Sequence, residues 1–354
     1  MKSKPPTPLS EIGEFGLIDR LTSKFTLKHK STIRGIGDDA AIIDAGKEYF
    51  VVTTDLLTEG IHFNLIYNPL KHLGYKAVAV NLSDIYAMNA IPKQITVSIA
   101  VSGKFSLEAV QELYSGIYLA CEKYNVDLVG GDTSSSLTGL TISITAIGTA
   151  KKEDIVYRKG AKVNDLICVT GDLGASYMGL QLLEREKVLF EKNPDFTPDF
   201  TGKDYLLERQ LKPEPRADII TLLKENGIIP SSMIDISDGL SSEILHICKN
   251  SEVGCRIYHD KIPINNETSL MADEFNIDPL ICALHGGEDY ELLFTVPLEL
   301  YDKISVIKGI SIIGNITLKD DKTLMVTKDG NIIELIAQGW DGMKDERSNI
   351  GGSS

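Results

Sequence analysis

Seven aspartates follow short apolar runs, and five of them stand directly beside glycine, serine or threonine. Two of them are adjacent in Gly37-Asp38-Asp39. At an effective dielectric of ~20, two carboxylates ~4 Å apart repel each other by roughly 4 kcal/mol, so water or a cation must screen the pair. Carboxylates are ligands for Mg²⁺, which also bridges to phosphates. We therefore expect the ends of several strands to converge on one metal–phosphate site built from Asp38, Asp39, Asp55, Asp84, Asp132, Asp235 and Asp238.

An aspartate at a strand end can also simply cap a turn or a helix, and for any single member of the set this is the simpler interpretation. Asp238 directly precedes a predicted helix and suits both roles. Capping explains the whole set less well, because the acidic residue recurs beside glycines, where a phosphate can approach the backbone.

Four further residues stand in predicted loops where they could contact a ligand. His62 is either a substrate contact or, more simply, an exposed loop residue, and Arg158 is either a phosphate contact or a solvated turn residue. Trp340, the only tryptophan, is either a core anchor or an aromatic ring that stacks on a cationic ligand. Glu288 is either a surface charge or a ligand contact, and the two glycines before it favour a close backbone approach.

Familiar nucleotide-binding motifs are absent from the sequence. Gly35-Ile36-Gly37-Asp38-Asp39-Ala40 formally fits a GxGxxA dinucleotide fingerprint, but residues 28–34 are not the apolar strand that this fingerprint requires. Neither a GxxxxGK[ST] phosphate loop nor the motif pair of protein kinases occurs. A nucleotide must therefore be bound in another way.

The hydrophobic pattern alternates between strand-like and helix-like segments, which predicts an α/β or α+β protein of two domains. A charged stretch at 151–154 indicates the boundary between them, and 190–204 reads as an exposed insertion. We expect helices over 10–21, 69–88, 106–123 and 240–249, and two more that end near 186 and 226. We expect strands over 40–43, 49–54, 94–101, 126–129, 140–149, 166–170, 233–236 and 290–296, and further strands before 339.

Composition narrows the class of protein. The net charge of −14, without a basic cluster, argues against a nucleic-acid-binding or membrane-surface protein. Five cysteines without a CxxC pair indicate a reduced, cytoplasmic protein. The chain has neither the apolar segment of a signal peptide nor a run of about 18 apolar residues that could span a membrane.

Taken together, seven motifs resemble the thiamine-monophosphate kinases, which use ATP to convert thiamine monophosphate to thiamine diphosphate. The resemblance extends from Glu11 to Met343, with the motifs in the family's order. The motifs are GIGDDAA (35–41), VVTTDLLTEGIHF (51–63), KAVAVNLSDIYAMNA (76–90), GGDTS (130–134), YRKGAKVND (157–165), MIDISDGLSSE (233–243) and HGGEDYELLF (285–294).

This resemblance implies the two-domain fold of the aminoimidazole ribonucleotide synthetase superfamily, with mixed sheets flanked by helices. Residues 1–155 would form an N-terminal domain for ATP binding, Mg²⁺ binding and dimerisation. Residues 156–343 would form a C-terminal α/β domain, and 344–354 a disordered tail. The expected assembly is a homodimer.

Site residues are implied by the same motifs. Mg²⁺ would be bound by Asp39, Thr53, Thr54, Asp55, Asp84, Asp132, Asp235 and Asp238, with Asp38 in support. ATP would contact Tyr114, Gly131, Asp132, Arg158 and Ser237, and thiamine monophosphate would contact His62, Glu288 and Trp340. The expected catalytic residues are Asp55, Asp84, Asp132 and Asp238.

The acceptor in this reaction is a phosphate monoester, whose second pKa of ~6 makes it mostly a dianion at neutral pH. We therefore expect direct in-line transfer without a general base or a phosphoenzyme, assisted by several Mg²⁺ ions. Three alternatives remain: a sibling enzyme with another substrate, a non-catalytic nucleotide-binding protein, and a structural dimer scaffold. Selenophosphate synthetases carry a reactive cysteine near the N-terminus, whereas the first cysteine here is Cys121.

Overall fold

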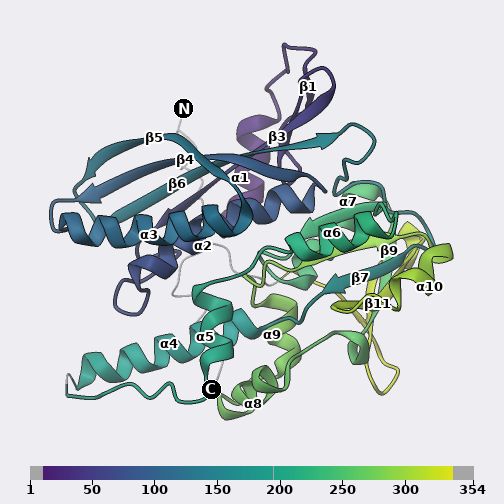
Figure 1. Cartoon of the computed structure of the whole chain (residues 1–354). Helices are drawn as coiled ribbons and strands as arrows, with labels where there is room; N and C mark the ends of the chain where they lie inside the picture. The colour runs from purple at the N-terminus through teal and green to yellow at the C-terminus, as the bar shows by residue number, and fades with distance from the viewer. Residues whose placement is uncertain (1–10, 194, 338–354) are drawn as a thin grey trace, which may run out of the picture.

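Two β-sheets with helices packed around them make up the structure, a computed structural model that describes residues 11–193 and 195–337 (Figure 1). The first sheet has six strands in the order β1-β2-β3-β6-β4-β5, with β4 and β5 parallel. These strands are β1 (Thr32–Arg34), β2 (Ala41–Asp44), β3 (Glu48–Thr58), β4 (Ile91–Ser102), β5 (Asp127–Ser136) and β6 (Leu140–Lys151). Mixed sheets flanked by helices confirm the predicted fold class.

Within the described residues, helices cover one face of the first sheet. In Figure 1, α2 (Leu70–Ala87) and α3 (Leu107–Tyr124) lie against this face. Along β6, buried residues alternate strictly with half-buried ones until the last residue. Because successive side chains of a strand point to opposite faces, this alternation indicates one face packed on helices and one face without such packing. We call the face without helix packing the open face.

Helix α2 is buried around nearly its whole circumference and is the central helix of the molecule. It contacts α3, β3 and β6 on one side and β8 of the second sheet on the other. A helix that is apolar all round belongs inside a core. Glycine allows α2 and α3 to approach closely: a Cβ on Gly74 would lie 2.0 Å from the carbonyl oxygen of Leu113, and one on Gly116 would lie 1.8 Å from that of Lys71.

The second sheet begins at Leu166 and contains seven strands in the order β13-β12-β9-β11-β7-β10-β8. Strands β7, β8 and β10 are buried along their whole length, as expected for strands covered on both faces. The strands are β7 (Leu166–Thr170), β8 (Ser232–Asp235), β9 (Gly254–Tyr258), β10 (Leu292–Val296), β11 (Ile310–Thr317), β12 (Thr323–Val326) and β13 (Ile332–Glu334).

The remaining helices precede the first sheet or surround the second. They are α1 (Gly13–Thr22), α4 (Ala175–Lys192), α5 (Asp204–Leu211), α6 (Ala217–Glu225), α7 (Leu240–Ser251), α8 (Asn266–Glu274), α9 (Pro279–His285) and α10 (Tyr301–Ile304). Short 3₁₀ segments occupy His259–Lys261, Leu298–Leu300 and Lys319–Asp321. Within the described residues, no helix is long and apolar enough to cross a membrane.

One hydrophobic core runs through both sheets. It contains Leu82 and Ile95 of the first half together with Met233 and Phe294 of the second. Helix α2 therefore packs on both sheets, and residues that project from it can meet residues of either half.

The predicted elements correspond to observed ones, but several of their bounds were wrong. The strand predicted at 126–129 as short and buried is β5, which has ten residues and is mostly exposed. This strand forms the edge of the sheet and is rich in glycine and serine, so the apolar pattern marks only its beginning. The pattern did not predict α5, α8, α9 or β9. The predicted tail 344–354 lies outside the described residues.

Candidate active site

Three carboxylates from three different elements converge where the two sheets meet. Asp39 lies in the loop before β2, Asp84 lies in α2, and Asp235 is the last residue of β8. One carboxylate oxygen from each lies within 4.8 Å of the others. We call these residues the aspartate triad. Its donor atoms are all carboxylate oxygens, which are the ligands that Mg²⁺ prefers.

Neighbouring hydroxyl groups orient two members of the triad. Thr53 of β3 donates its hydroxyl to Asp84 Oδ2 at 2.6 Å. Ser83, which precedes Asp84 in α2, donates its hydroxyl to Asp235 Oδ2 at 2.6 Å. Since each bond joins two elements, α2 is linked both to the first sheet and to the second at this point.

The third member is held by an arginine. Arg158 donates from Nη2 and Nε to Asp39 Oδ1, at 2.8 and 3.1 Å, and its backbone N–H donates to Asp38 Oδ1 at 3.0 Å. Arg34 Nε lies 3.3 Å from Asp38 Oδ2. The other oxygen of Asp39, Oδ2, is buried and has no hydrogen-bond partner among the described residues. A buried carboxylate oxygen left unpaired in this way is suited to bind a cation.

Asp55 lies beside the triad on the first sheet. It stands two residues after Thr53 in β3, so both side chains point to the helix-covered face. Its backbone N–H donates to Asn81 Oδ1 of α2 at 3.0 Å. Burial, together with the charge of Glu14, raises the pKa of Asp55 to about 6.

Electrostatics at the triad favour a bound cation. Burial raises the pKa of Asp84 well above its usual value, and the charges of Asp55, Asp235 and Asp39 raise it further. Burial also raises the pKa of Asp235 to about 7, with the charge of Asp39 adding to the effect. Within the described residues, Asp55, Asp84 and Asp235 have no ion pair with a basic side chain. A divalent cation would supply the missing positive charge, so these residues fit Mg²⁺.

The prediction that these aspartates stand at strand ends was wrong for three of them. Asp84 lies inside a helix, and Asp55 and Asp132 lie inside β3 and β5. The apolar stretch before Asp84 continues a buried helix, and the sheet strands run on past the polar residues. Short apolar runs do not distinguish these cases from strand ends.

Thr54 and Asp132 are not brought to the triad within one chain. The hydroxyl of Thr54 donates to the backbone oxygen of Ile144 at 3.1 Å, and Thr54 points to the open face because it follows Thr53. Asp132 pairs with Ser98 of β4, which pairs with Ser143 of β6 on the same open face. Three strand spacings of about 4.8 Å separate β3 from β5, which is about 14 Å along the sheet.

Gly131 and Tyr114, predicted to contact ATP, also lie away from the triad. Gly131 precedes Asp132 in the edge strand β5. Tyr114 lies in α3, where its ring meets that of Tyr118 edge-on at 5.9 Å. No described hydrogen bond or ion pair joins Tyr114 to the triad.

The loop after β8 brings Ser237 and Asp238 close to the triad. Glu243 of α7 accepts hydrogen bonds at Oε1 from the backbone N–H of Asp238, at 2.9 Å, and from the hydroxyl of Ser237, at 3.4 Å. Its other oxygen, Oε2, is buried, and no residue in the described part of the chain bonds to it. Burial and the charge of Asp238 raise the pKa of Glu243 well above its usual value. The sequence analysis did not single out this glutamate.

A second loop, which carries Glu288, packs on the first. The backbone N–H of Glu288 donates to the carbonyl of Ser237 at 2.6 Å. Glu288 has a φ of 56°, which is uncommon for a residue with a side chain and often marks a functional site. A Cβ on Gly287, whose φ is 72°, would lie 2.5 Å from the carbonyl oxygen of Ser237, so only glycine fits there.

His62 lies close to Glu288. Its Nδ1 accepts a hydrogen bond from the backbone N–H of Thr58 at 3.1 Å. Burial lowers the pKa of His62, although the nearby charge of Glu288 opposes this shift. The structure therefore brings together two of the three residues predicted to contact substrate, while Trp340 lies outside the described residues.

Sequence reasoning missed the residues that hold the predicted ones in place. Ser83 and Asn81 lie in α2 and bond to Asp235 and Asp55, and Glu14 of α1 acts on Asp55 through its charge. Polar side chains inside an otherwise apolar helix were a usable signal for the first two, because such groups need buried partners. No signal in the sequence marked Glu14.

Comparisons with known proteins agree on one class. The family described as "AIR synthase related protein, N-terminal domain" matches residues 37–150. The thiamine-monophosphate kinase of Aquifex aeolicus is 36% identical over 83% of this chain and 89% of its own length. The enzyme of that name from Escherichia coli is 34% identical over 93% of this chain and 98% of its own.

A solved structure extends this likeness to three dimensions. The structure described as "AaThiL complexed with AMPPCP and TMP" matches with a TM-score of 0.79 and 32% identity, over 96% of this chain and 99% of that one. Fold and acidic site thus define an enzyme related to AIR synthase. Within that class, the chain belongs to the thiamine-monophosphate kinase family.

Proposed function

We propose that this protein transfers the γ-phosphoryl group of ATP to thiamine monophosphate, giving ADP and thiamine diphosphate. The observation that carries the proposal is the aspartate triad, at the junction of the two sheets, in a chain of this family. Further support comes from the similar structure, which is described as complexed with AMPPCP and TMP. An acidic site of this kind can bind negatively charged phosphate groups only if divalent cations lie between the carboxylates and the phosphates.

The residues proposed to hold several Mg²⁺ ions are acidic or hydroxylic. When bound, Mg²⁺ neutralises phosphate charge and aligns the reacting groups, which supplies most of phosphoryl-transfer catalysis. The triad, with Asp55 beside it, forms the centre of the metal site, and Asp38 supports it through its hydrogen bond to the backbone of Arg158. The full proposed set is Asp38, Asp39, Thr53, Thr54, Asp55, Asp84, Asp132, Asp235 and Asp238.

ATP is bound on the side of the triad where Arg158 and Ser237 lie. The guanidinium group of Arg158 is largely buried against Asp39, so its direction is fixed before a nucleotide arrives. An arginine held in this way offers planar donors to phosphate oxygens. Tyr114, Gly131 and Asp132 complete the proposed ATP site.

Thiamine monophosphate is bound by His62, Glu288 and Trp340. The thiazolium ring is cationic, so a carboxylate and an aromatic ring are suitable contacts. The nearness of His62 and Glu288 supports a shared site for this part of the substrate. The substrate phosphate then lies toward the metal site, because Glu288 bonds to the backbone of Ser237.

The transfer itself is direct and in-line, without a phosphoenzyme. The acceptor phosphate, with a second pKa of ~6, is already mostly a dianion and needs no base to activate it. Asp55, Asp84, Asp132 and Asp238 act by holding the charged groups in place. Radiolabelled γ-phosphate that stayed on the protein without an acceptor would contradict this mechanism.

We assign metal and ATP binding and dimerisation to residues 1–155, and a supporting α/β domain to 156–343. In the active homodimer, two open faces meet. This arrangement accounts for Thr54 and Asp132, which share the open face about 14 Å apart along the sheet of one chain. Asp132 of one chain then lies toward Thr54 of the other across the two open faces, where the two side chains together can hold one of the Mg²⁺ ions.

The test is a product assay with purified protein, thiamine monophosphate, ATP and MgCl₂. The proposal expects thiamine diphosphate and ADP in equal amounts, and none when a chelator removes the metal. Thiamine and selenide serve as comparison acceptors. ATP hydrolysis that depends on another acceptor would replace the proposal with a sibling activity, and ATP binding without turnover would indicate a non-catalytic protein.

A further inference from the structure

The carboxylate of Glu288 is held by two buried side chains from opposite halves of the molecule. Lys76 of α2 places its Nζ 3.0 Å from Oε1. Gln210 of α5 donates from its side-chain amide to Oε2 at 2.9 Å. The side chain of Lys76 is 2% exposed and that of Glu288 is 29% exposed, so Lys76 is buried while the Glu288 side chain remains partly open to a ligand.

The two holding residues are themselves fixed. Lys76 Nζ also donates to the backbone oxygen of Gln210 at 3.0 Å. Ser176 of α4 donates its hydroxyl to Gln210 Oε1 at 2.5 Å, which sets the amide so that its NH₂ group faces Glu288. Both Ser176 and Gln210 are buried. We call Lys76, Gln210 and Ser176 the Glu288 clamp.

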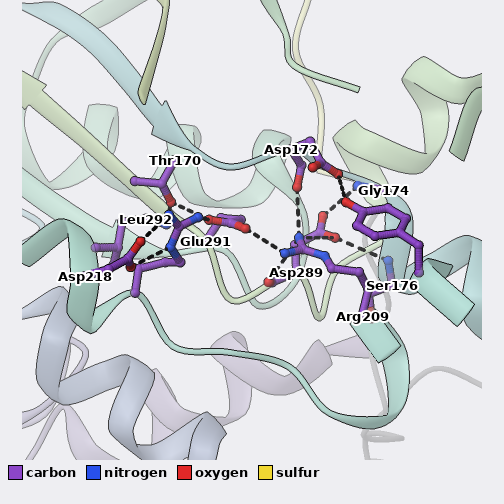
Figure 2. A network of polar contacts seen from close by, with 11 residues as sticks. Thr170, Asp172, Gly174, Ser176, Arg209, Asp218, Asp289, Glu291 and Leu292 are labelled. Carbon is purple, nitrogen blue, oxygen red and sulfur yellow. Dashed lines mark hydrogen bonds and ion pairs between the residues drawn. The ribbon is translucent and has the colours of Figure 1, made fainter. Parts of the chain in front are cut away.

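Helix α5 also holds the backbone that carries Glu288. Figure 2 shows Arg209, the neighbour of Gln210, among the carboxylates that follow Glu288. Its guanidinium donates to Glu291 Oε1 at 2.7 Å and to the backbone oxygen of Asp289 at 3.5 Å. Two adjacent residues of α5 therefore fix the side chain of Glu288 and the loop around it.

The geometry leaves Glu288 free to bind one more partner. An ionised carboxylate has about four acceptor positions, and the clamp occupies one on each oxygen. The ammonium group of Lys76, 3.0 Å from Oε1, lies on one side of the Glu288 carboxylate and leaves the rest of it accessible. We propose that Lys76 and Gln210 are positioning residues, which hold the Glu288 carboxylate in the orientation that binds the thiamine part of the substrate. This inference rests on the proposed function.

A purely structural link between the halves is the competing explanation. Such links exist elsewhere: Tyr75 donates to Glu214 at 2.7 Å, and Lys123 pairs with the same carboxylate at 2.6 Å. Those contacts involve no proposed ligand residue. The two explanations differ in which kinetic constant changes when Lys76 or Gln210 is replaced.

The first experiment measures Lys76→Met and Gln210→Leu against wild type. We expect KM and the calorimetric Kd for thiamine monophosphate to rise about tenfold, with KM for ATP unchanged. Lys71→Met is the matched control, because Lys71 is exposed on the same helix, and it should leave both constants unchanged. If Lys76→Met fails to fold, Lys76→Arg takes its place. Equal changes in both KM values, or none, would overturn the inference.

A double-mutant cycle with Glu288→Gln gives the sharper result. If Lys76 acts through Glu288, Lys76→Met has little further effect on substrate affinity once Glu288 is changed. The same loss in both backgrounds would show that Lys76 acts independently and would overturn the proposal. A wild-type protein that makes no thiamine diphosphate would instead refute the proposed function, so the two failures are distinguishable.

Discussion

At the scale of single residues, the candidate site contains more buried carboxylates than basic side chains that pair with them. Among the residues that the structure describes, Arg158 donates to one oxygen of Asp39 and no group donates to the other, while the side chains of Asp84 and Asp235 accept hydrogen bonds only from hydroxyl groups. Hydroxyl donors orient a carboxylate but do not neutralise it. The raised pKa values of Asp84 and Asp235 mean that the charged forms of these carboxylates are unfavourable in the metal-free protein. A bound cation would stabilise the charged forms.

Asp55→Asn tests the metal site without disturbing the core. We expect turnover to fall roughly 100-fold or more, because an amide is a poorer ligand for Mg²⁺ and carries no charge. The free energy of unfolding in a chelator should be unchanged or higher, since a carboxylate with a raised pKa is lost. Urea unfolding and steady-state kinetics measure both.

Asp329→Asn is the control for that substitution, because Asp329 lies exposed between β12 and β13. It should leave turnover unchanged. Near-normal turnover of Asp55→Asn would remove Asp55 from the metal site.

In the metal-free protein, Asp55 and Asp235 should contribute stability that is lost as pH rises from about 4 to about 7. The pKa of Asp235 is raised to about 7 and that of Asp55 to about 6, from the ordinary value of 3.8. Between those values the folded state binds more protons than the unfolded state, so stability falls with rising pH. Melting temperatures in a chelator measure this slope. Excess Mg²⁺ should flatten it, and a slope that Mg²⁺ leaves unchanged would contradict the metal site.

Most of the candidate site residues could be named from sequence motifs. The motifs did not show which of these residues lie on the helix-covered face of the first sheet and which lie on its open face. Thr53, Thr54 and Asp55 are consecutive, yet Thr54 points away from the other two, as strand geometry requires. Sequence also gave no sign of the Lys76–Glu288 pair, because its members are 212 positions apart and come together only through packing.

At the scale of elements, α2 organises the site. It contributes Lys76, Asn81, Ser83 and Asp84, and it packs on both sheets. Its position depends on α3, which approaches it at Gly74 and Gly116. The site is therefore sensitive to changes in helix packing some distance away.

Gly74→Ala should destabilise the fold by about 1–3 kcal/mol, because the new methyl group would overlap the carbonyl of Leu113. The higher helix propensity of alanine offsets part of this loss. Gly103→Ala is the matched control, since no atom lies within 4 Å of its added Cβ. Urea unfolding compares the two variants. Equal stabilities would show that α2 and α3 can move apart without cost.

Long periodic segments of the fold were predictable, and short or edge elements were not. The helix predicted at 69–88 and the strand at 166–170 match α2 and β7 closely. Strand β5 extends past its apolar beginning because it is paired by β4, which is a tertiary effect. Helix α5 has only eight residues, and its two buried residues, Leu206 and Gln210, carry little periodic signal.

At the scale of the whole molecule, the proposed site needs two chains. A mixture of Asp55→Asn and Asp132→Asn proteins tests this, because each variant alone should be inactive. After exchange of subunits, half of the dimers are mixed and each contains one intact site, so about one quarter of wild-type activity should return. A mixture that stays inactive, although exchange is shown by mass-tagged subunits, would place Asp132 in its own chain's site.

The account depends most on a divalent cation at the aspartate triad, so the decisive measurement is anomalous diffraction from crystals grown with Mn²⁺ and a non-hydrolysable ATP analogue. The account predicts an anomalous peak within about 2.2 Å of carboxylate oxygens of Asp39, Asp84 and Asp235. Nucleotide bound with its manganese elsewhere, and the triad without a peak, would contradict it.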